Sequence, residues 1–141
     1  MTADPQRTDD SRSLGRLTAI HGSVIDVRFC AGGLPAVGTG IEIERDEHRL
    51  VAEVQQHLDP VTVRAVAMDN TAGLSRGAKA RATGGSIRVP VGDAVLGRLL
   101  NAVGLLTDRG PSLPADIQYR PIHGASVCAA RWVKVPPSAS K

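Results

Sequence analysis

Residues 15–29 read GRLTAIHGSVIDVRF, and this stretch decides the fold. An apolar run is followed by a break at residues 21–23, and apolar side chains then alternate with charged ones along residues 25–29. Alternation with period two is typical of a strand that buries one face and exposes the other to water. The stretch therefore predicts a β-hairpin with one face exposed to solvent.

The same kind of pattern continues along the chain. Four further segments are predicted to be strands: residues 41–44, 50–58, 61–68 and 86–89. Asp59-Pro60 turns the chain, and the turn-rich segment at residues 69–79 precedes the last strand. Six strands with no helix between them indicate a closed barrel or a sandwich, because small antiparallel sheets must hide their edges.

Beyond Pro90 the apolar period changes from two to nearly four, which predicts a short helix capped by Asp93 and ended by Gly104. One side of this helix carries Val95, Leu96, Leu99, Leu100, Ala102 and Val103. A second structural unit is expected to start here and to run through a proline-rich connector to residue 123. We divide the chain into a disordered leader (1–13), a barrel (14–90), this incomplete unit (91–123) and a divergent basic tail (124–141).

Composition narrows the choice of partners. The 141 residues amount to about one domain, and the net charge of +3 comes from the end of the chain. Residues 14–117 hold eleven basic and eleven acidic side chains, whereas residues 118–141 hold four basic ones and no acidic one. The only aromatic residues are Phe29, Tyr119 and Trp132. Because nucleic-acid sites need a basic surface or aromatic faces for bases, we expect no nucleic-acid partner.

The sequence carries no sign of membrane insertion or secretion. No apolar run approaches the roughly 18 residues that cross a bilayer, and residues 1–13 contain no apolar stretch of the kind found in signal peptides. The two cysteines, Cys30 and Cys128, have no metal-ligand spacing and are expected to be reduced thiols. We expect a cytoplasmic protein.

The stretch GGSIRVPVGDAVLGR (84–98) is rich in glycine, as phosphate-binding loops are. A P-loop needs Gly-x-x-x-x-Gly-Lys-Ser/Thr between a strand and a helix, and that string is absent. The nearest approach, residues 73–79, has the wrong spacing, and Pro90 removes a donor from the quoted stretch. We therefore expect its glycines to serve the backbone: Gly84 and Gly85 turn the chain, and Gly92 and Gly97 allow close packing or a helix start.

The histidines give no catalytic or metal site either. None of the four has a carboxylate or cysteine at the spacing of a zinc site, and each is expected to be solvated or hydrogen-bonded: His21, His48, His57 and His123. No nucleophile elbow and no Ser/His/Asp set is present. The prediction is that this chain has no catalytic, cofactor-binding or metal-binding residue.

Three segments, in this order, resemble the N-terminal part of the β subunit of the rotary F-type ATP synthase: GRLTAIHGSVIDVRF (15–29), LVAEVQQHL (50–58) and VRAVAMDNTAGLSRGAKARATGGSIRVPVGDAVLGRLLNAVG (63–104). The resemblance covers about residues 14–123. AMDNTAGLSRG followed by VPVG, LGR and N-x-x-G separates the β subunit from the α subunit and from the flagellar and secretion ATPases. EVQQHLDP, RATGG and RPIH further suggest the alternative, sodium-type synthases of some bacteria.

The resemblance implies a six-stranded antiparallel barrel. In that family, α and β barrels alternate in a hexameric crown, so α subunits are the implied partners. The VPVG to LGR segment leads into the α/β nucleotide-binding domain, which would be incomplete here. The P-loop and the other catalytic groups, together with bound MgATP or MgADP, are expected to lie beyond this chain's end. In an assembled complex the chain would lie in the cytoplasm, peripheral to the inner membrane, with protons or sodium ions as the coupled ion.

The resemblance stops at Gly124, and the remainder, GASVCAARWVKVPPSASK, matches no family pattern. This suggests translation in another frame or an ending acquired after truncation. The predicted function is therefore a structural and assembly part of an ATP synthase β subunit, not an enzyme by itself. The alternatives are a stand-alone barrel that binds a partner, or a truncated product without function.

Overall fold

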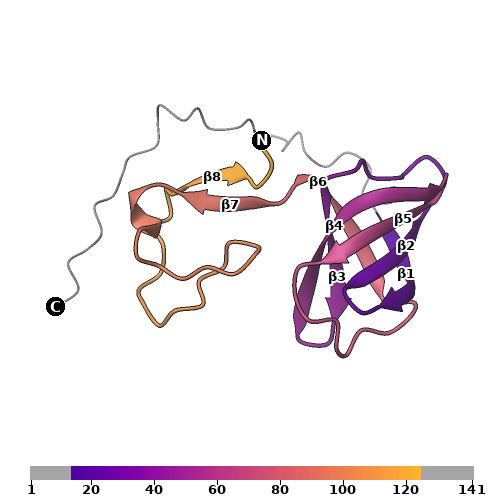
Figure 1. Ribbon diagram of the computed structural model, residues 1–141, viewed down its shortest axis with the longest axis horizontal. Helices are drawn as coiled ribbons and strands as arrows, with labels where there is room; N and C mark the ends of the chain where they lie inside the picture. The colour runs from indigo at the N-terminus through magenta and orange to yellow at the C-terminus, as the bar shows by residue number, and fades with distance from the viewer. Residues whose placement is uncertain (1–13, 125–141) are drawn as a thin grey trace, which may run out of the picture.

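A computed structural model of the protein describes residues 14–124. Six strands close into an antiparallel barrel in the order β1-β2-β5-β4-β3-β6. Their bounds are β1 Leu14–His21, β2 Val24–Phe29, β3 Thr39–Arg45, β4 His48–Asp59, β5 Thr62–Ala67 and β6 Lys79–Ser86. Figure 1 shows the barrel on one side and a smaller unit, built around β7 (Arg88–Val91) and β8 (Gln118–Pro121), on the other. The predicted all-β barrel is confirmed.

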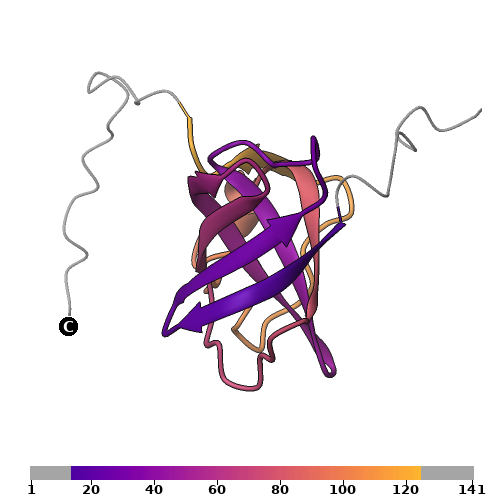
Figure 2. The ribbon, with the colours of Figure 1, turned by 90° about the vertical axis from the view of Figure 1, so that its right-hand side faces the viewer.

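The predicted hairpin is strands β1 and β2, joined at Gly22 and Ser23. Gly22 has φ 62°, a left-handed conformation that glycine adopts without strain. In Figure 2, where the barrel faces the viewer, these two indigo strands run diagonally across it. Gly15 leaves room for a neighbouring ring, because a Cβ there would lie 3.0 Å from Phe29 Cδ1. The alternation along β2 places its apolar side chains in the barrel and Arg28 in solvent.

The barrel core consists of aliphatic side chains and a single aromatic one. Its buried members are Leu17, Ile25, Val27, Phe29, Ile41, Ile43, Leu50, Ala52, Val54, Val63, Ala65, Ala67 and Ala80. Two loops cross opposite ends of the barrel, because β2 must reach β3 and β5 must reach β6. Each loop contributes a leucine, Leu34 or Leu74, that packs on the core. The loops therefore close the barrel as well as connect it.

The sixth strand was placed wrongly by the sequence pattern. We predicted residues 86–89, but the barrel closes with β6, Lys79–Ser86, which pairs with β1 and β3. The interior positions of β6 are the small residues Ala80 and Ala82, so its apolar signal is weak. Gly84 (φ 82°) does not end the strand but lies in an irregularity where four residues of β6 span two of β3.

The helix predicted beyond Pro90 is also wrong. The only helical segment among the described residues is a single 3-10 turn, Asp93–Val95, whose N-cap is Gly92 and not Asp93. Gly97 has φ 71°, which a right-handed helix cannot contain, and Leu96 (ψ 131°) is already extended. The proline-rich connector instead ends in β8, which pairs with β7 from Arg88–Pro121 to Val91–Gln118. The leader, and the tail beyond Gly124, lie outside the described residues.

One ion pair on the barrel wall gives a pH-dependent prediction. Arg64 on β5 donates two hydrogen bonds to Asp26 on β2, Nε to Oδ1 at 2.8 Å and Nη2 to Oδ2 at 3.0 Å. These bonds lower the pKa of Asp26 although its partial burial opposes the shift. A carboxylate whose pKa is lowered by folding stabilises the fold above its unfolded pKa, and this contribution is lost as the pH falls through its folded pKa.

Asp26→Asn should therefore lower the melting temperature at pH 7, where the wild-type carboxylate is ionised. The difference between the two proteins should shrink below about pH 4, where carboxyl groups of ordinary pKa become protonated in the unfolded chain. Melting curves between pH 7 and pH 2.5 measure this. If the difference in melting temperature stays constant across that range, the charge of Asp26 does not stabilise the barrel.

Candidate functional site

The features that could serve a function lie at the junction between the barrel and the β7–β8 unit. After β8 the chain runs back to the barrel, where His123 Nε2 lies 2.9 Å from both carboxylate oxygens of Glu53. The Glu53 side chain is only 6% exposed, and Gln55 Nε2 donates to its Oε1 at 2.8 Å. His123 is thus hydrogen-bonded, as predicted, but its partner could not have been found from sequence because the two residues are 70 positions apart.

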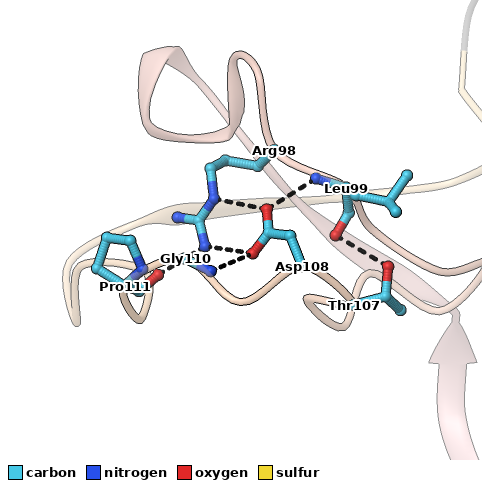
Figure 3. A network of polar contacts seen from close by, with 6 residues as sticks. All are labelled: Arg98, Leu99, Thr107, Asp108, Gly110 and Pro111. Carbon is cyan, nitrogen blue, oxygen red and sulfur yellow. Dashed lines mark hydrogen bonds and ion pairs between the residues drawn. The ribbon is translucent and has the colours of Figure 1, made fainter.

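A second polar cluster organises the loop between β7 and β8, as Figure 3 shows. Arg98 Nε and Nη2 each donate to the Asp108 carboxylate at 2.8 Å, and Nη2 also donates to the carbonyl of Pro111. Asp108 further accepts the backbone N–H groups of Leu99 and Gly110. The hydrogen bonds from Arg98, with those from the two amides, hold the pKa of Asp108 far below its ordinary value. The carboxylate therefore ties Arg98 and Leu99 to residues 108–110 within this loop.

The Asn101 to Gly104 motif forms a tight turn next to this cluster. Asn101 Oδ1 accepts the N–H groups of Val103 and Leu105, at 3.1 and 2.8 Å. Gly104 has φ 79° and packs so closely on β7 that a Cβ would lie 2.7 Å from Pro90 Cδ. The LGR and N-x-x-G motifs therefore serve backbone geometry in this structure.

Asp108→Ala tests the role of the cluster. Removing the carboxylate leaves the amides of Leu99 and Gly110 without their acceptor, so both should exchange hydrogen faster. The amides inside the barrel strands should keep their protection. Asp116→Ala, at an exposed carboxylate of the same loop, is the control and should change neither set. NMR-detected hydrogen exchange gives the answer residue by residue, and unchanged exchange at Leu99 and Gly110 would contradict the role given to Asp108.

Backbone amides of the glycine stretch 84–98 form hydrogen bonds within the stretch itself. The N–H groups of Val95, Leu96 and Arg98 donate to the carbonyl oxygens of Gly92, Asp93 and Val95. Gly92 (φ 110°) and Gly97 (φ 71°) have open space where a Cβ would stand, so of the two expected roles, close packing or a helix start, close packing is wrong. Gly92 does start the 3-10 turn, as its N-cap. These three amides therefore already have acceptors within the stretch itself.

The junction also contains a cleft of about 650 Å³ between the barrel wall and the loop that carries Val103 and Leu105. Charged side chains of mixed sign surround it, together with His48: Glu42, Arg45, Arg49, Asp69 and Arg88. Several of these are already engaged, since Arg49 pairs with Glu42 at 2.9 Å and Arg45 donates to the carbonyl of Asn70 at 2.6 Å. The cleft offers no convergent set of free polar groups.

The other predicted positions are distributed over the barrel. His57 Nε2 lies 2.7 Å from the carbonyl oxygen of Pro35, while His21 and His48 are exposed at the ends of strands. Within residues 14–124 no three His, Cys, Asp or Glu side chains are grouped so that they could hold a metal ion. Cys30 is a free, exposed thiol, and Cys128 lies outside the described residues. In the same part of the chain, no helix has the length and apolarity needed to cross a membrane.

The β7–β8 unit exposes large apolar side chains. Leu96 is 73% exposed and Leu99 and Leu105 are each 63% exposed, with Tyr119 and Ile122 also at the surface. A two-stranded sheet by itself is marginally stable in water, and of the residues in this unit just Pro90 and Gly104 are buried. Leu96 and Leu99 were expected on a helix, but the structure places them in a turn and a loop.

Comparison with known proteins covers the barrel and the junction. Residues 17–84 match the family described as "ATP synthase alpha/beta family, beta-barrel domain". The chain is 65% identical over 118 residues to "ATP synthase subunit beta 2" of Bradyrhizobium sp. (strain BTAi1), a match that covers 83% of the chain and 25% of that protein. It is 48% identical over 120 residues to "ATP synthase subunit beta 2" of Gluconobacter oxydans, covering 84% of the chain and 25% of that protein.

A third relative, "ATP synthase subunit beta 3" of Paraburkholderia xenovorans, is 48% identical over 124 residues, which is 87% of the chain and 25% of that protein. The chain thus spans about a quarter of the length of these curated relatives. The similarity includes the junction as well as the barrel, because the matched lengths exceed the barrel strands by several tens of residues.

Proposed function

We propose that the chain is a structural and assembly part of an F-type ATP synthase β subunit, because residues 17–84 match the β-barrel domain of the ATP synthase alpha/beta family. The observation that carries the proposal is a closed barrel with its own buried core, in a sequence 65% identical to a β subunit. In the full complex such a part serves ATP synthesis or hydrolysis coupled to ion transport. Its own contribution is to bind neighbouring α subunits, in the cytoplasm at the periphery of the membrane.

We assign residues 91–123 to the start of the nucleotide-binding domain. The support is the exposed leucines of this unit, which have no core of their own to enter and fit a surface that packs on further protein. The relatives are named beta 2 and beta 3, which agrees with an alternative synthase present besides another one.

We further propose that the described residues hold no catalytic nucleotide site. The P-loop string is absent, the amides of the glycine stretch donate to the chain's own carbonyls, and the LGR and N-x-x-G motifs shape loops. Calorimetric titration of the chain with MgATP should show no heat of binding. A dissociation constant in the micromolar range would contradict this part of the proposal.

The assembly role is tested with the α subunit of the same organism. The tagged chain and the α subunit are mixed and separated by size-exclusion chromatography, and a complex of the two is the expected result. Interfaces that persist bury about 1,000 Å² or more, so the concentrations should reach tens of micromolar to detect a weak complex. Absence of a complex at those concentrations would contradict the proposed function.

A further inference from the structure

The barrel and the β7–β8 unit are connected in two places. A single residue, Ile87, separates β6 from β7, so the chain leaves the barrel through a short link. After β8 the N–H of Ile122 donates to the carbonyl of Ile87 at 2.9 Å, and the next residue, His123, contacts the barrel. In Figure 1, β7 runs away from the barrel and β8 runs back toward it. The placement of the unit therefore depends on Ile87 and His123.

Ile87 supplies an apolar contact at the link. Its side chain is 8% exposed, and Gly40 on β3 leaves room for it, because a Cβ at Gly40 would lie 3.1 Å from Ile87 Cγ1. Beyond the link, the loop with Val103 and Leu105 faces the barrel wall across the cleft of about 650 Å³. Two units that share a small interface are expected to move relative to each other. Ile87 by itself is therefore a pivot, which leaves the direction of the unit open.

His123 supplies the polar contact. Of residues 88–124, only His123 forms a hydrogen bond with a barrel strand, since its Nε2 lies 2.9 Å from each carboxylate oxygen of Glu53 on β4. Both the imidazolium and the neutral tautomer with its proton on Nε2 can donate to a carboxylate. The Glu53 side chain is 6% exposed, whereas that of His123 is 64% exposed. The carboxylate is thus buried in the barrel wall, and the imidazole reaches it from the surface.

Glu53 depends on this donor. An ionised carboxylate only accepts hydrogen bonds, and a buried oxygen left without a donor destabilises the fold. Gln55 Nε2 donates to Oε1 of Glu53 at 2.8 Å, but among the described residues the side-chain donor to Oε2 is His123. Glu53 and His123 are also the only titratable side chains among the described residues that line the cleft of about 560 Å³ around this contact. No other cation lining that cleft could replace His123.

We infer that His123 is a positioning residue: with Ile122 it forms a strap that holds the β7–β8 unit to Glu53 and so fixes the direction of that unit relative to the barrel. Ile87 is the pivot, and the strap is the contact that can open, because it ends in an exposed side chain. With the strap closed, the barrel and the unit move as one body. With the strap open, the unit turns about Ile87 while the barrel keeps its own core.

His123→Ala tests the strap in the full chain, and residual dipolar couplings measured by NMR report the direction of each unit. In the wild type a single alignment tensor should fit the amides of the barrel and of the β7–β8 unit. In His123→Ala the two sets should need separate tensors. The amide of Ile122 should also exchange hydrogen about tenfold faster or more, because the opened strap no longer holds it on the carbonyl of Ile87. Amides of the barrel strands should keep their protection, since His123 lies outside the barrel core.

Glu53→Gln tests the same contact from the barrel. The amide keeps the shape of the side chain but removes the negative charge and one acceptor oxygen, so the strap should open here too. In the double variant, exchange at Ile122 should stay within about twofold of that in His123→Ala, because both changes remove one contact. If the two effects multiply, the residues act separately and the inference is wrong. His123→Ala decides by itself if Glu53→Gln disrupts the barrel.

The matched control is His21→Ala, which removes an exposed imidazole at the end of β1 that forms no hydrogen bond with residues 87–124. A single tensor should still fit this variant, and exchange at Ile122 should not change. The inference is wrong if a single tensor also fits His123→Ala, or if the wild type already needs two. These measurements use no α subunit, so their outcome is independent of the assembly role proposed above.

Discussion

Val27→Asp is expected to unfold the barrel. Val27 lies on β2 with 0% of its surface exposed, inside the cluster that forms the whole barrel core. Its neighbours in that cluster are apolar, so none of them could pair with a new carboxylate. Burying an unpaired charge, or protonating it to avoid that, costs several kcal/mol, and a domain of this size has a total stability of about 5–15 kcal/mol. Far-ultraviolet circular dichroism should show loss of the strand signal at 25 °C.

The control for this variant is Val37→Asp, the same substitution at a side chain that is 60% exposed on the loop before β3. Its carboxylate stays in water, so the free energy of unfolding should change by no more than about 0.5 kcal/mol. A folded Val27→Asp with a melting temperature near that of the wild type would mean that position 27 does not face a packed interior. The barrel topology would then be in error.

Leu17→Ala should produce the next largest loss while leaving the protein folded. Leu17 lies on β1 and is 1% exposed. Its N–H donates to the carbonyl of Ala78, in the loop before β6, at 3.0 Å, so this residue also joins that loop to the barrel. Truncating a buried leucine leaves a cavity and typically costs about 2–5 kcal/mol. Urea denaturation should show a lower midpoint with an unchanged slope, because the surface exposed on unfolding stays nearly the same.

Leu14→Ala provides the comparison on the same strand, at a side chain that is 44% exposed. It should cost less than about 1 kcal/mol, because most of the removed surface already contacts water. Equal losses for the two variants would show that the inner and outer faces of β1 are not distinguished as the structure has them.

The sequence pattern predicted a strand correctly where large apolar side chains alternate with polar ones. Residues 25–29 have large apolar side chains at every second position, and their register with β5 follows from that alternation. Strand β6 was not predicted because its inward-facing side chains are alanines. Alanines fill a narrow interior but do not give the alternation of large apolar residues on which a strand prediction rests. The irregularity at Gly84 further breaks the period on which such a prediction depends.

The junction shows the opposite failure, in which a pattern was present but did not decide the structure. The apolar spacing after Pro90 fits a helix, yet the side chains of Asn101 and Asp108 accept backbone N–H groups that a helix would use. Glycines at positive φ supply the remaining bends. Hydrogen bonds from side chains to nearby backbone groups therefore outweigh a helical spacing of apolar residues when those residues have no core to pack against.

By itself the sequence determined the all-β barrel, its first hairpin and its resemblance to ATP synthase β subunits, because these depend on local alternation and on contiguous motifs. Tertiary structure decided which segment closes the barrel and that His123 reaches the buried Glu53. Each of these depends on strands or connections far apart in the chain, and closure of the sheet sets their register. A net charge counted along the sequence cannot show that closure places Glu42 of β3 beside Arg81 of β6.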